Sequence, residues 1–171
     1  MSADAPSTEG SLAVTRSELF HVGIVVRDLE HAKERFSELL GVSWGPVIVT
    51  EQMQLRTGDG DDIVVPNRIC YSTEPPYLEL IEEQEGSPYL WNAESNLHHI
   101  GYFIDDLGSN SNSLILQGCP LIASGRMGDR APVTFTLHSE LGVRIEHLDV
   151  AMRDIVIGRM CRPERPREGS G

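Results

Sequence analysis

Apolar and polar residues follow one another with a period that changes along the chain. From Leu19 to Val26 the residues are mostly apolar or β-branched, which predicts a buried strand. The next stretch, LEHAKERFSELLG, has apolar residues at helical spacing and predicts a helix that begins after Asp28 and ends at Gly41. Extended segments follow in WGPVIVTEQMQL, IVVPNRICYS and PYLELIEE. The first half of the chain therefore predicts the order β-α-β-β-β.

The same order of elements returns in the second half. LHHIGYFI predicts a strand, a helix is expected from about Asp106 to Gln117, and PLIASGR, PVTFTLHS and GVRIEHLD predict three further strands. The motif HVGIVVRDL, which begins at His21, is repeated as HIGYFIDDL at His99, 78 residues later. This internal repeat predicts two equivalent modules.

Composition sets the expected boundaries of these modules. The first residues, rich in Ala, Ser and Pro, and the charged last residues bury too little apolar surface to fold. We therefore expect a disordered arm at 1–16, the first module at 17–83, a linker that offers an apolar lid at 84–96, the second module at 97–150 and a C-terminal tail at 151–171.

Each module also carries a His and a Glu in strands that are otherwise largely apolar. Glu79 lies in PYLELI and Glu146 in VRIEHL, and a carboxylate between apolar neighbours is costly to bury unless it is paired, protonated or bound to a metal. His21 and His99 occupy the same position of the repeat. We therefore predict that these four residues bind one divalent metal ion where the two modules meet.

Two neighbouring histidines compete for the second position. Only the choice of His99 also aligns Gly101 with Gly23, and the alternation of strand side chains then turns His98 to the opposite face. We expect the two glycines to allow close packing of the backbone near the site.

Other polar residues have simpler interpretations. Asp28 and Asp106 are expected to cap helices. His138 and His147 are expected to face solvent rather than to support the metal ligands. The three cysteines have no metal-binding or disulfide spacing and are interpreted as reduced thiols, namely Cys70, Cys119 and Cys161.

The overall charge narrows the class of partner. A net charge of −12 argues against binding to nucleic acid or to an anionic membrane and favours a small-molecule substrate. No signal peptide and no apolar run of membrane-spanning length is recognised, so we expect a cytoplasmic location and no membrane partner.

Residues 19–150 resemble the vicinal oxygen chelate superfamily, the group of glyoxalase I, methylmalonyl-CoA epimerase and the bleomycin-resistance proteins. The resemblance rests on HVGIVVRDL, the helix ending ELLGV, the restart LHHIGYFIDDL and the final GVRIEHLD. It implies an α+β fold in which two tandem βαβββ modules form a cupped, incompletely closed, eight-stranded mixed β-barrel, often in homodimers. By position, it also implies that His21, Glu79, His99 and Glu146 hold one divalent ion per chain, with Zn, Ni, Co, Mn, Fe and Mg all compatible.

The resemblance also implies a reaction. The epimerase-like branch, which is the most similar, removes a proton next to a carbonyl group that the metal binds, so Glu146 is the first candidate base and Glu79 the second. The substrate would offer two adjacent oxygens and could be an acyl-CoA or a bulky apolar compound. Epimerases place an additional Glu in the strand corresponding to EQMQLRTGDG, where only Glu51 comes near.

Three other functions remain open: a lyase like glyoxalase I, a non-haem iron dioxygenase if only one Glu binds the metal, and a module that sequesters a bulky molecule without catalysis. Aromatic residues that could line an apolar pocket for such a ligand are Trp44, Tyr77, Tyr89, Trp91, Tyr102 and Phe103. Arginines that could bind a phosphate-bearing substrate are Arg56, Arg68, Arg126, Arg130 and Arg144.

Overall fold

The computed structural model describes residues 17–126, 128 and 130–163, so the arm expected at 1–16 and the last residues of the tail lie outside the described part. The first module contains the elements β1 (Glu18–Val26), α1 (Leu29–Leu40), β2 (Ile48–Thr57), β3 (Asp62–Tyr71) and β4 (Tyr77–Glu82). The second contains β5 (Leu97–Ile104), α2 (Leu107–Leu116), β6 (Leu121–Arg126), β7 (Pro132–His138) and β8 (Arg144–Asp149). The predicted β-α-β-β-β order is therefore present twice.

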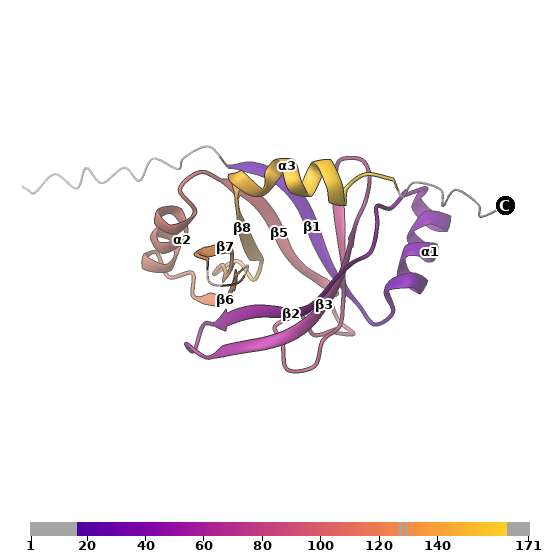
Figure 1. The fold of residues 1–171 in the computed structure, drawn as a ribbon. Coiled ribbons are helices and arrows are strands. Elements are labelled where there is room, and N and C mark those ends of the chain that lie inside the picture. The colour runs from indigo at the N-terminus through magenta and orange to yellow at the C-terminus, as the bar shows by residue number, and fades with distance from the viewer. Residues whose placement is uncertain (1–16, 127, 129, 164–171) are drawn as a thin grey trace, which may run out of the picture.

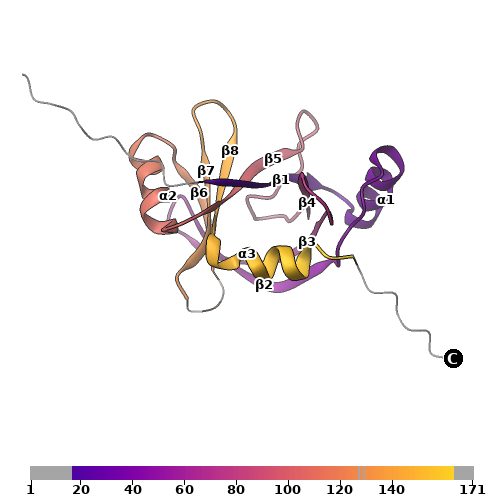
Figure 2. The ribbon, with the colours of Figure 1, turned by 90° about the horizontal axis from the view of Figure 1, so that it is seen from above.

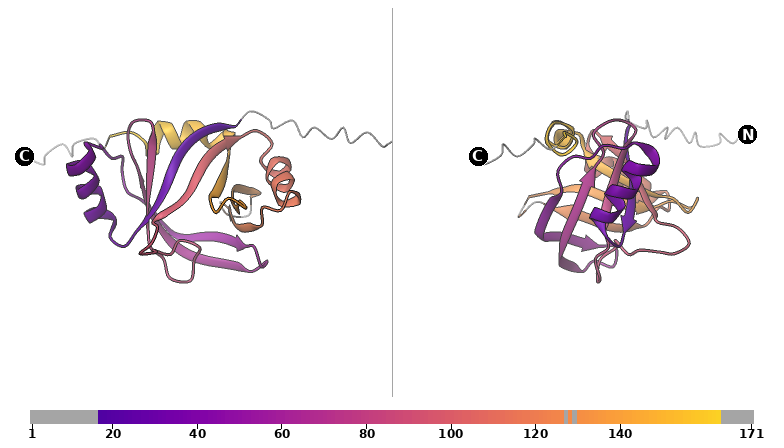
Figure 3. Two further views of the ribbon diagram at one scale, coloured as in Figure 1. Left: turned by 180° about the vertical axis from the view of Figure 1, so that it is seen from behind. Right: turned by 90° about the vertical axis from the view of Figure 1, so that its right-hand side faces the viewer.

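The eight strands form one mixed β-barrel in the order β1-β4-β3-β2-β6-β7-β8-β5. The two first strands, β1 and β5, pair antiparallel and run side by side through the middle of the molecule (Figures 1 and 3). Each first strand also pairs in parallel with the last strand of its own module, β1 with β4 and β5 with β8. The pairing is more complete than the incompletely closed barrel that we expected, because Gln54–Thr57 of β2 pair with Ala123–Arg126 of β6 and join the modules a second time.

Both helices begin at the expected aspartates. The Asp28 carboxylate accepts a hydrogen bond from the backbone N–H of His31, and the Asp106 carboxylate accepts one from Ser109. Gly41 ends α1 in the left-handed conformation that glycine adopts without strain. The helices lie at opposite ends of the barrel (Figures 1 and 2).

A C-terminal helix, which we define as residues 150–160, was not predicted from the sequence. It combines a 3-10 turn (Val150–Met152), α3 (Arg153–Ile155) and a π-helical turn (Val156–Met160), and it crosses one side of the barrel (Figure 2). Val156 packs into a core cluster with Phe20, Tyr71, Phe103, Leu148 and Cys161. The chain after β8 is therefore partly a structural element and not a simple tail.

Two further apolar clusters fill the first module. Val25, Leu55, Val65, Ile81 and Tyr89 form one of them, and residues of α1 pack with Cys70 and Leu80 in the other. All three cysteines are free thiols, as expected. None of the helices in the described residues combines the length and the apolar character needed to cross a membrane.

Candidate metal centre

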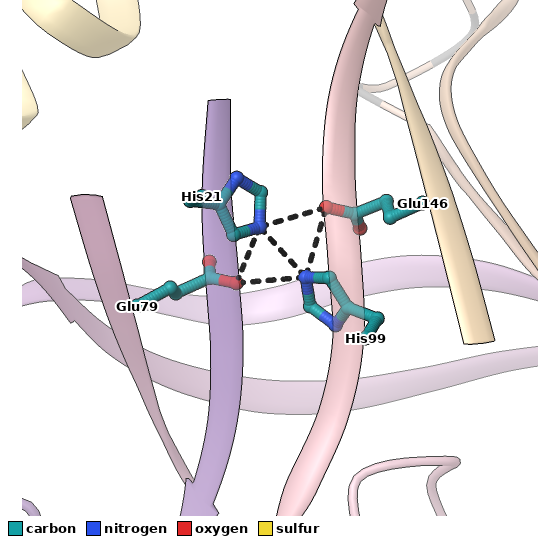
Figure 4. A group of neighbouring side chains, drawn as sticks. All are labelled: His21, Glu79, His99 and Glu146. Carbon is teal, nitrogen blue, oxygen red and sulfur yellow. Dashed lines mark hydrogen bonds and ion pairs between the residues drawn. The ribbon is translucent and has the colours of Figure 1, made fainter. Parts of the chain in front are cut away.

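The predicted quartet comes together inside the barrel, with one residue on each of four strands (Figure 4). His21 lies on β1 and His99 on the adjacent β5, while Glu79 on β4 and Glu146 on β8 flank them. Strand register produces this arrangement, because Gly23 pairs with both His99 and Glu79 on its two sides. Gly101 pairs in the same way with His21 and Glu146, so the two modules contribute equivalent halves.

The four side chains converge on one point. The Nε2 atoms of His21 and His99 are 2.7 Å apart. Glu79 Oε2 lies 3.2 Å from each of these nitrogens, and Glu146 Oε2 lies 3.4 Å from that of His21 and 3.3 Å from that of His99. All four side chains are buried. Two imidazoles and two carboxylates therefore share a small, water-poor volume.

The glycine of each module makes room for the histidine of the other. A Cβ atom placed on Gly23 would overlap the His99 ring, and one placed on Gly101 would overlap the His21 ring. The repeated His-x-Gly pattern is therefore one structural device: the first position supplies an imidazole, and the third removes the side chain that would block the other imidazole.

Burial and mutual charge determine the protonation of the quartet. Burial by itself would raise the pKa of Glu146, but the positive charge of His99 and hydrogen bonds from both histidines lower it to about 2. The pKa of Glu79 is also lowered, because the charge of His21 and the same kind of hydrogen bonds outweigh its burial. Burial would lower the pKa of His99, but the two carboxylates raise it to about 10. Both carboxylates are therefore ionised at neutral pH.

This set of donors fits a divalent cation. The four ligand atoms lie within 4.8 Å of one another. Ligands that bind one ion at about 2.0–2.2 Å are themselves roughly 3 to 4.4 Å apart, depending on their angle at the ion. The His–Glu distances of 3.2 to 3.4 Å lie in this range, whereas the two histidine nitrogens, at 2.7 Å, would move slightly apart around an ion. Two neutral imidazoles and two carboxylates also supply the charge that a divalent ion needs. The described residues thus offer a centre that could hold such an ion.

The two carboxylates differ in their second oxygen. Glu79 Oε1 accepts a hydrogen bond of 2.5 Å from the hydroxyl of Tyr71, the residue opposite it on β3. The residue opposite Glu146 is Thr136 of β7, and no described residue donates a hydrogen bond to Glu146 Oε1. Glu79 is therefore held at both oxygens, whereas Glu146 is held at one.

A cavity of about 660 Å³ opens from the two carboxylates into the barrel. Its walls are mainly apolar, and the C-terminal helix contributes Met152, Ile155 and Met160 to them. Glu79 and Glu146 are the carboxylates among the described residues that line it. The centre therefore adjoins a space of the size that binds a small organic molecule.

The residues that line the cavity include some of those predicted to contact a substrate and exclude others. Glu51 is exposed and does not line it, so the described lining contains no additional carboxylate of the epimerase type. Of the six aromatic candidates only Tyr89 lines it, and Tyr71, which we did not predict, joins it there. Trp44 instead packs against Phe36.

The neighbouring histidines have separate roles. His98 lies outside the quartet, as expected, and places Nδ1 at 2.9 Å from His99 Nδ1 and Nε2 at 3.1 Å from the Pro88 carbonyl. His138 is exposed, as expected. The expectation for His147 was wrong, because it is buried and its Nδ1 lies 3.0 Å from the Ser111 hydroxyl. The outer face of β8, where we expected solvent, is covered there by α2.

Comparison with known proteins agrees with this architecture. A family model described as the glyoxalase/bleomycin resistance protein/dioxygenase superfamily matches residues 20–136. A hypothetical protein from Bacillus halodurans C-125 is similar in structure, with a TM-score of 0.57 and 17% identity over 78% of this chain and 94% of that chain. No curated protein matches the chain significantly.

Methylmalonyl-CoA epimerases are also similar in structure. One in complex with methylmalonyl-CoA and NH4+ has a TM-score of 0.55 and 19% identity, over 81% of this chain and 96% of that chain. A variant of the Streptomyces coelicolor enzyme in complex with 2-nitronate-propionyl-CoA has the same score and identity, over 81% of this chain and 99% of that chain. At this identity the likeness shows a shared fold.

Proposed function

The chain belongs to the glyoxalase/bleomycin resistance protein/dioxygenase superfamily, the vicinal oxygen chelate group, and on that premise we propose that it is a divalent-metal-dependent enzyme. The proposed reaction is proton transfer at a carbon next to a carbonyl group that chelates the metal, as in an epimerase or isomerase. His21, Glu79, His99 and Glu146 would hold the ion. An ion bound there supplies Lewis acidity, which lowers the cost of removing the adjacent proton.

One observation supports this proposal most strongly. Both carboxylates of the quartet line the cavity, but only Glu146 has a second oxygen without a hydrogen-bond donor from the described residues. Such an oxygen is accessible to the proton of a bound substrate and remains a base while the other oxygen faces the histidines. We assign the proton transfer to Glu146 and a mainly anchoring role to Glu79, which Tyr71 also holds.

The surrounding residues provide the conditions for this step. The apolar walls exclude water from the substrate, which strengthens the attraction between its polarised carbonyl group and charges at the centre. The lowered pKa of Glu146 keeps this carboxylate in the ionised form that a proton acceptor requires at neutral pH. The missing third carboxylate in the described lining favours a mechanism with one proton carrier over a mechanism with two separate bases.

The test is exchange of an α-proton for deuterium in heavy water. The protein would be loaded in turn with Zn, Ni, Co, Mn, Fe and Mg, and offered 2-acyl thioesters, 2-hydroxy carbonyl compounds and hemithioacetals. We expect exchange that requires a metal and is lost with a chelator. Glu51→Gln serves as the matched control, because it removes an exposed carboxylate outside the cavity and should leave exchange unchanged.

Other results would contradict the proposal and name a different function. Tight binding of a bulky ligand by metal-free protein, without exchange under any loading, would indicate a sequestering module. Oxygen uptake by the iron-loaded protein with a catechol would indicate a dioxygenase. Conversion of a hemithioacetal into a stable thioester would keep the proton transfer but place the enzyme among the glyoxalase-like lyases.

A further inference from the structure

Two unpartnered polar groups line the cavity away from the metal centre. Among the described residues, three buried side-chain polar atoms have no hydrogen-bond partner, and these are His21 Nδ1, Asn67 Oδ1 and Arg126 Nε. Asn67 and Arg126 both line the cavity. Most buried side-chain polar atoms in proteins are hydrogen-bonded to the protein or to water, so two exceptions in one cavity wall point to a position where a water or a polar group of a ligand can bind.

Strand register places these two residues at the same depth. Asn67 lies on β3 four residues before Tyr71, which pairs with Glu79. Arg126 pairs with Pro132, which lies on β7 four residues before Thr136, the partner of Glu146. Four residues of strand correspond to about 13 Å. Each module thus contributes one polar residue to the cavity wall, at a comparable distance along the strands from the carboxylates.

Arg126 is also distinguished from the other arginines that were candidates for substrate binding. Arg68 binds Glu82, Arg56 pairs with Asp62, and Arg144 donates to the Pro88 carbonyl. None of these three lines the cavity, whereas Arg126 does and the exposed Arg130 joins it. In a chain with a net charge of −12, two cations at one end of the substrate cavity mark a local reversal of charge.

Building on the proposed function, we propose that Asn67 and Arg126 form a polar subsite that selects the far end of the substrate. The Arg126 guanidinium requires an acceptor, which a carboxylate or phosphate supplies best. The Asn67 amide can both donate and accept, and thus completes the contacts of such a group or of a neighbouring hydroxyl. The substrate would carry its chelating oxygens at one end, an apolar middle, and an anionic group on the order of 10 Å away.

Hydroxamates test this subsite without requiring turnover, because a hydroxamate offers two adjacent oxygens to a metal. We would measure calorimetrically the affinity of the metal-loaded protein for adipic, suberic and sebacic monohydroxamic acids. Each would be compared with the hexano-, octano- or decanohydroxamic acid of equal length, which ends in a methyl group. We expect the terminal carboxylate to increase affinity about tenfold at the best-fitting length, as for a hydrogen bond to a charged group.

The preference for a terminal carboxylate should depend on Arg126 and Asn67. Arg126→Gln should abolish it and Arg126→Lys should retain part of it, while Arg56→Gln, which removes an equal charge from an exposed residue outside the cavity, should leave it intact. Asn67→Leu should weaken the preference without lowering the thermal midpoint of unfolding, since the replaced polar atom has no protein partner to lose. If Asn67 had only a structural role, Asn67→Leu would lower the thermal midpoint and leave the preference for the terminal carboxylate unchanged.

The possible failures are distinguishable. If the metal-loaded protein binds every hydroxamate but no acid more tightly than its methyl-ended partner, the polar subsite is wrong and the metal centre stands. If the protein binds neither series with any metal, the proposed function fails, and the subsite that rests on it fails as well.

Discussion

The first module holds its carboxylate with a second side chain, and the second module does not. Tyr71 and Thr136 occupy equivalent positions, each paired across the sheet with the glutamate of its module. Only Tyr71 reaches the carboxylate, at 2.5 Å. The duplicated framework thus places two chemically identical groups in environments that differ in one hydrogen bond, and the freer carboxylate is the better candidate for moving a proton.

The histidines show a second difference, on the side away from the centre. His99 Nδ1 lies 2.9 Å from His98 Nδ1, whereas His21 Nδ1 is buried without a partner among the described residues. A hydrogen bond at the far nitrogen fixes the orientation and tautomer of a ligating imidazole. The repeat therefore duplicates the His and the Glu of the quartet but not the residues that support them, and the two modules differ in these supporting residues.

The largest expected effect separates the two glutamates. Glu146→Gln should reduce metal-dependent α-proton exchange by roughly 10²- to 10⁴-fold, the usual contribution of a general base. Glu79→Gln should reduce exchange less at equal metal content, because we assign Glu79 a mainly anchoring role. Metal content must be measured for each variant so that exchange is expressed per bound ion. Equal losses in both variants would contradict the division of roles.

The glycines test whether the modules depend on each other. Gly23→Ala should displace His99, and Gly101→Ala should displace His21, because the added methyl group overlaps the ring. We expect each change to weaken metal binding on the order of 10- to 100-fold and to destabilise the fold by about 1–3 kcal/mol, measured by urea unfolding. Gly108→Ala is the matched control, since a Cβ there meets no atom within 4 Å. Unchanged metal affinity in the first two variants would show that the rings can relocate freely.

The coupled charges predict a pH dependence of metal binding. The pKa of His99 is raised to about 10 in the absence of a metal, so this imidazole carries a proton at neutral pH. An ion needs the neutral ring, and its binding must therefore release at least one proton. Affinity should increase by up to about tenfold per pH unit between pH 7 and 9. Calorimetry in buffers of different ionisation enthalpy measures the number of protons released on metal binding. A value of zero would contradict a protonated His99 in the metal-free protein.

The smallest expected effect concerns the support of Glu79. Tyr71→Phe removes one hydrogen bond to a buried carboxylate and should destabilise the protein by about 1.5 kcal/mol in denaturant unfolding. Thr136→Val, at the equivalent position of the second module, should change the free energy of unfolding by less than about 0.5 kcal/mol, the range of changes that break no specific contact. Equal effects would remove the distinction between the modules.

Sequence patterns predicted the repeat and the quartet because both depend on local rules. Strand alternation and the fixed offset between His21 and His99 were sufficient to select His99, the histidine that lies in the quartet, over His98. The convergence of Glu79 and Glu146 then followed from their positions in equivalent last strands. These relations can be inferred without knowledge of tertiary contacts, because equivalent residues of the two modules occupy equivalent positions in their strands.

Features that depend on contacts between distant segments could not be predicted in this way. The C-terminal helix has Met152, Val156 and Met160 at helical spacing, but its mixed turns are stabilised by packing on the barrel. His147 alternates with Glu146 and was expected to face solvent, yet α2 covers that face through Ser111. The subsite residues Asn67 and Arg126 are related only through cross-strand pairing, which no pattern in the sequence reveals.

We propose that two histidines and two glutamates, one of each from each module, bind a single divalent ion. The most direct test of this proposal is the metal stoichiometry of purified protein after loading and gel filtration, measured by mass spectrometry of the elements. We expect about one ion per chain in the native protein and almost none in the double variant His21→Ala, His99→Ala, provided that circular dichroism shows both to be folded. Full metal occupancy in a folded double variant would contradict the account.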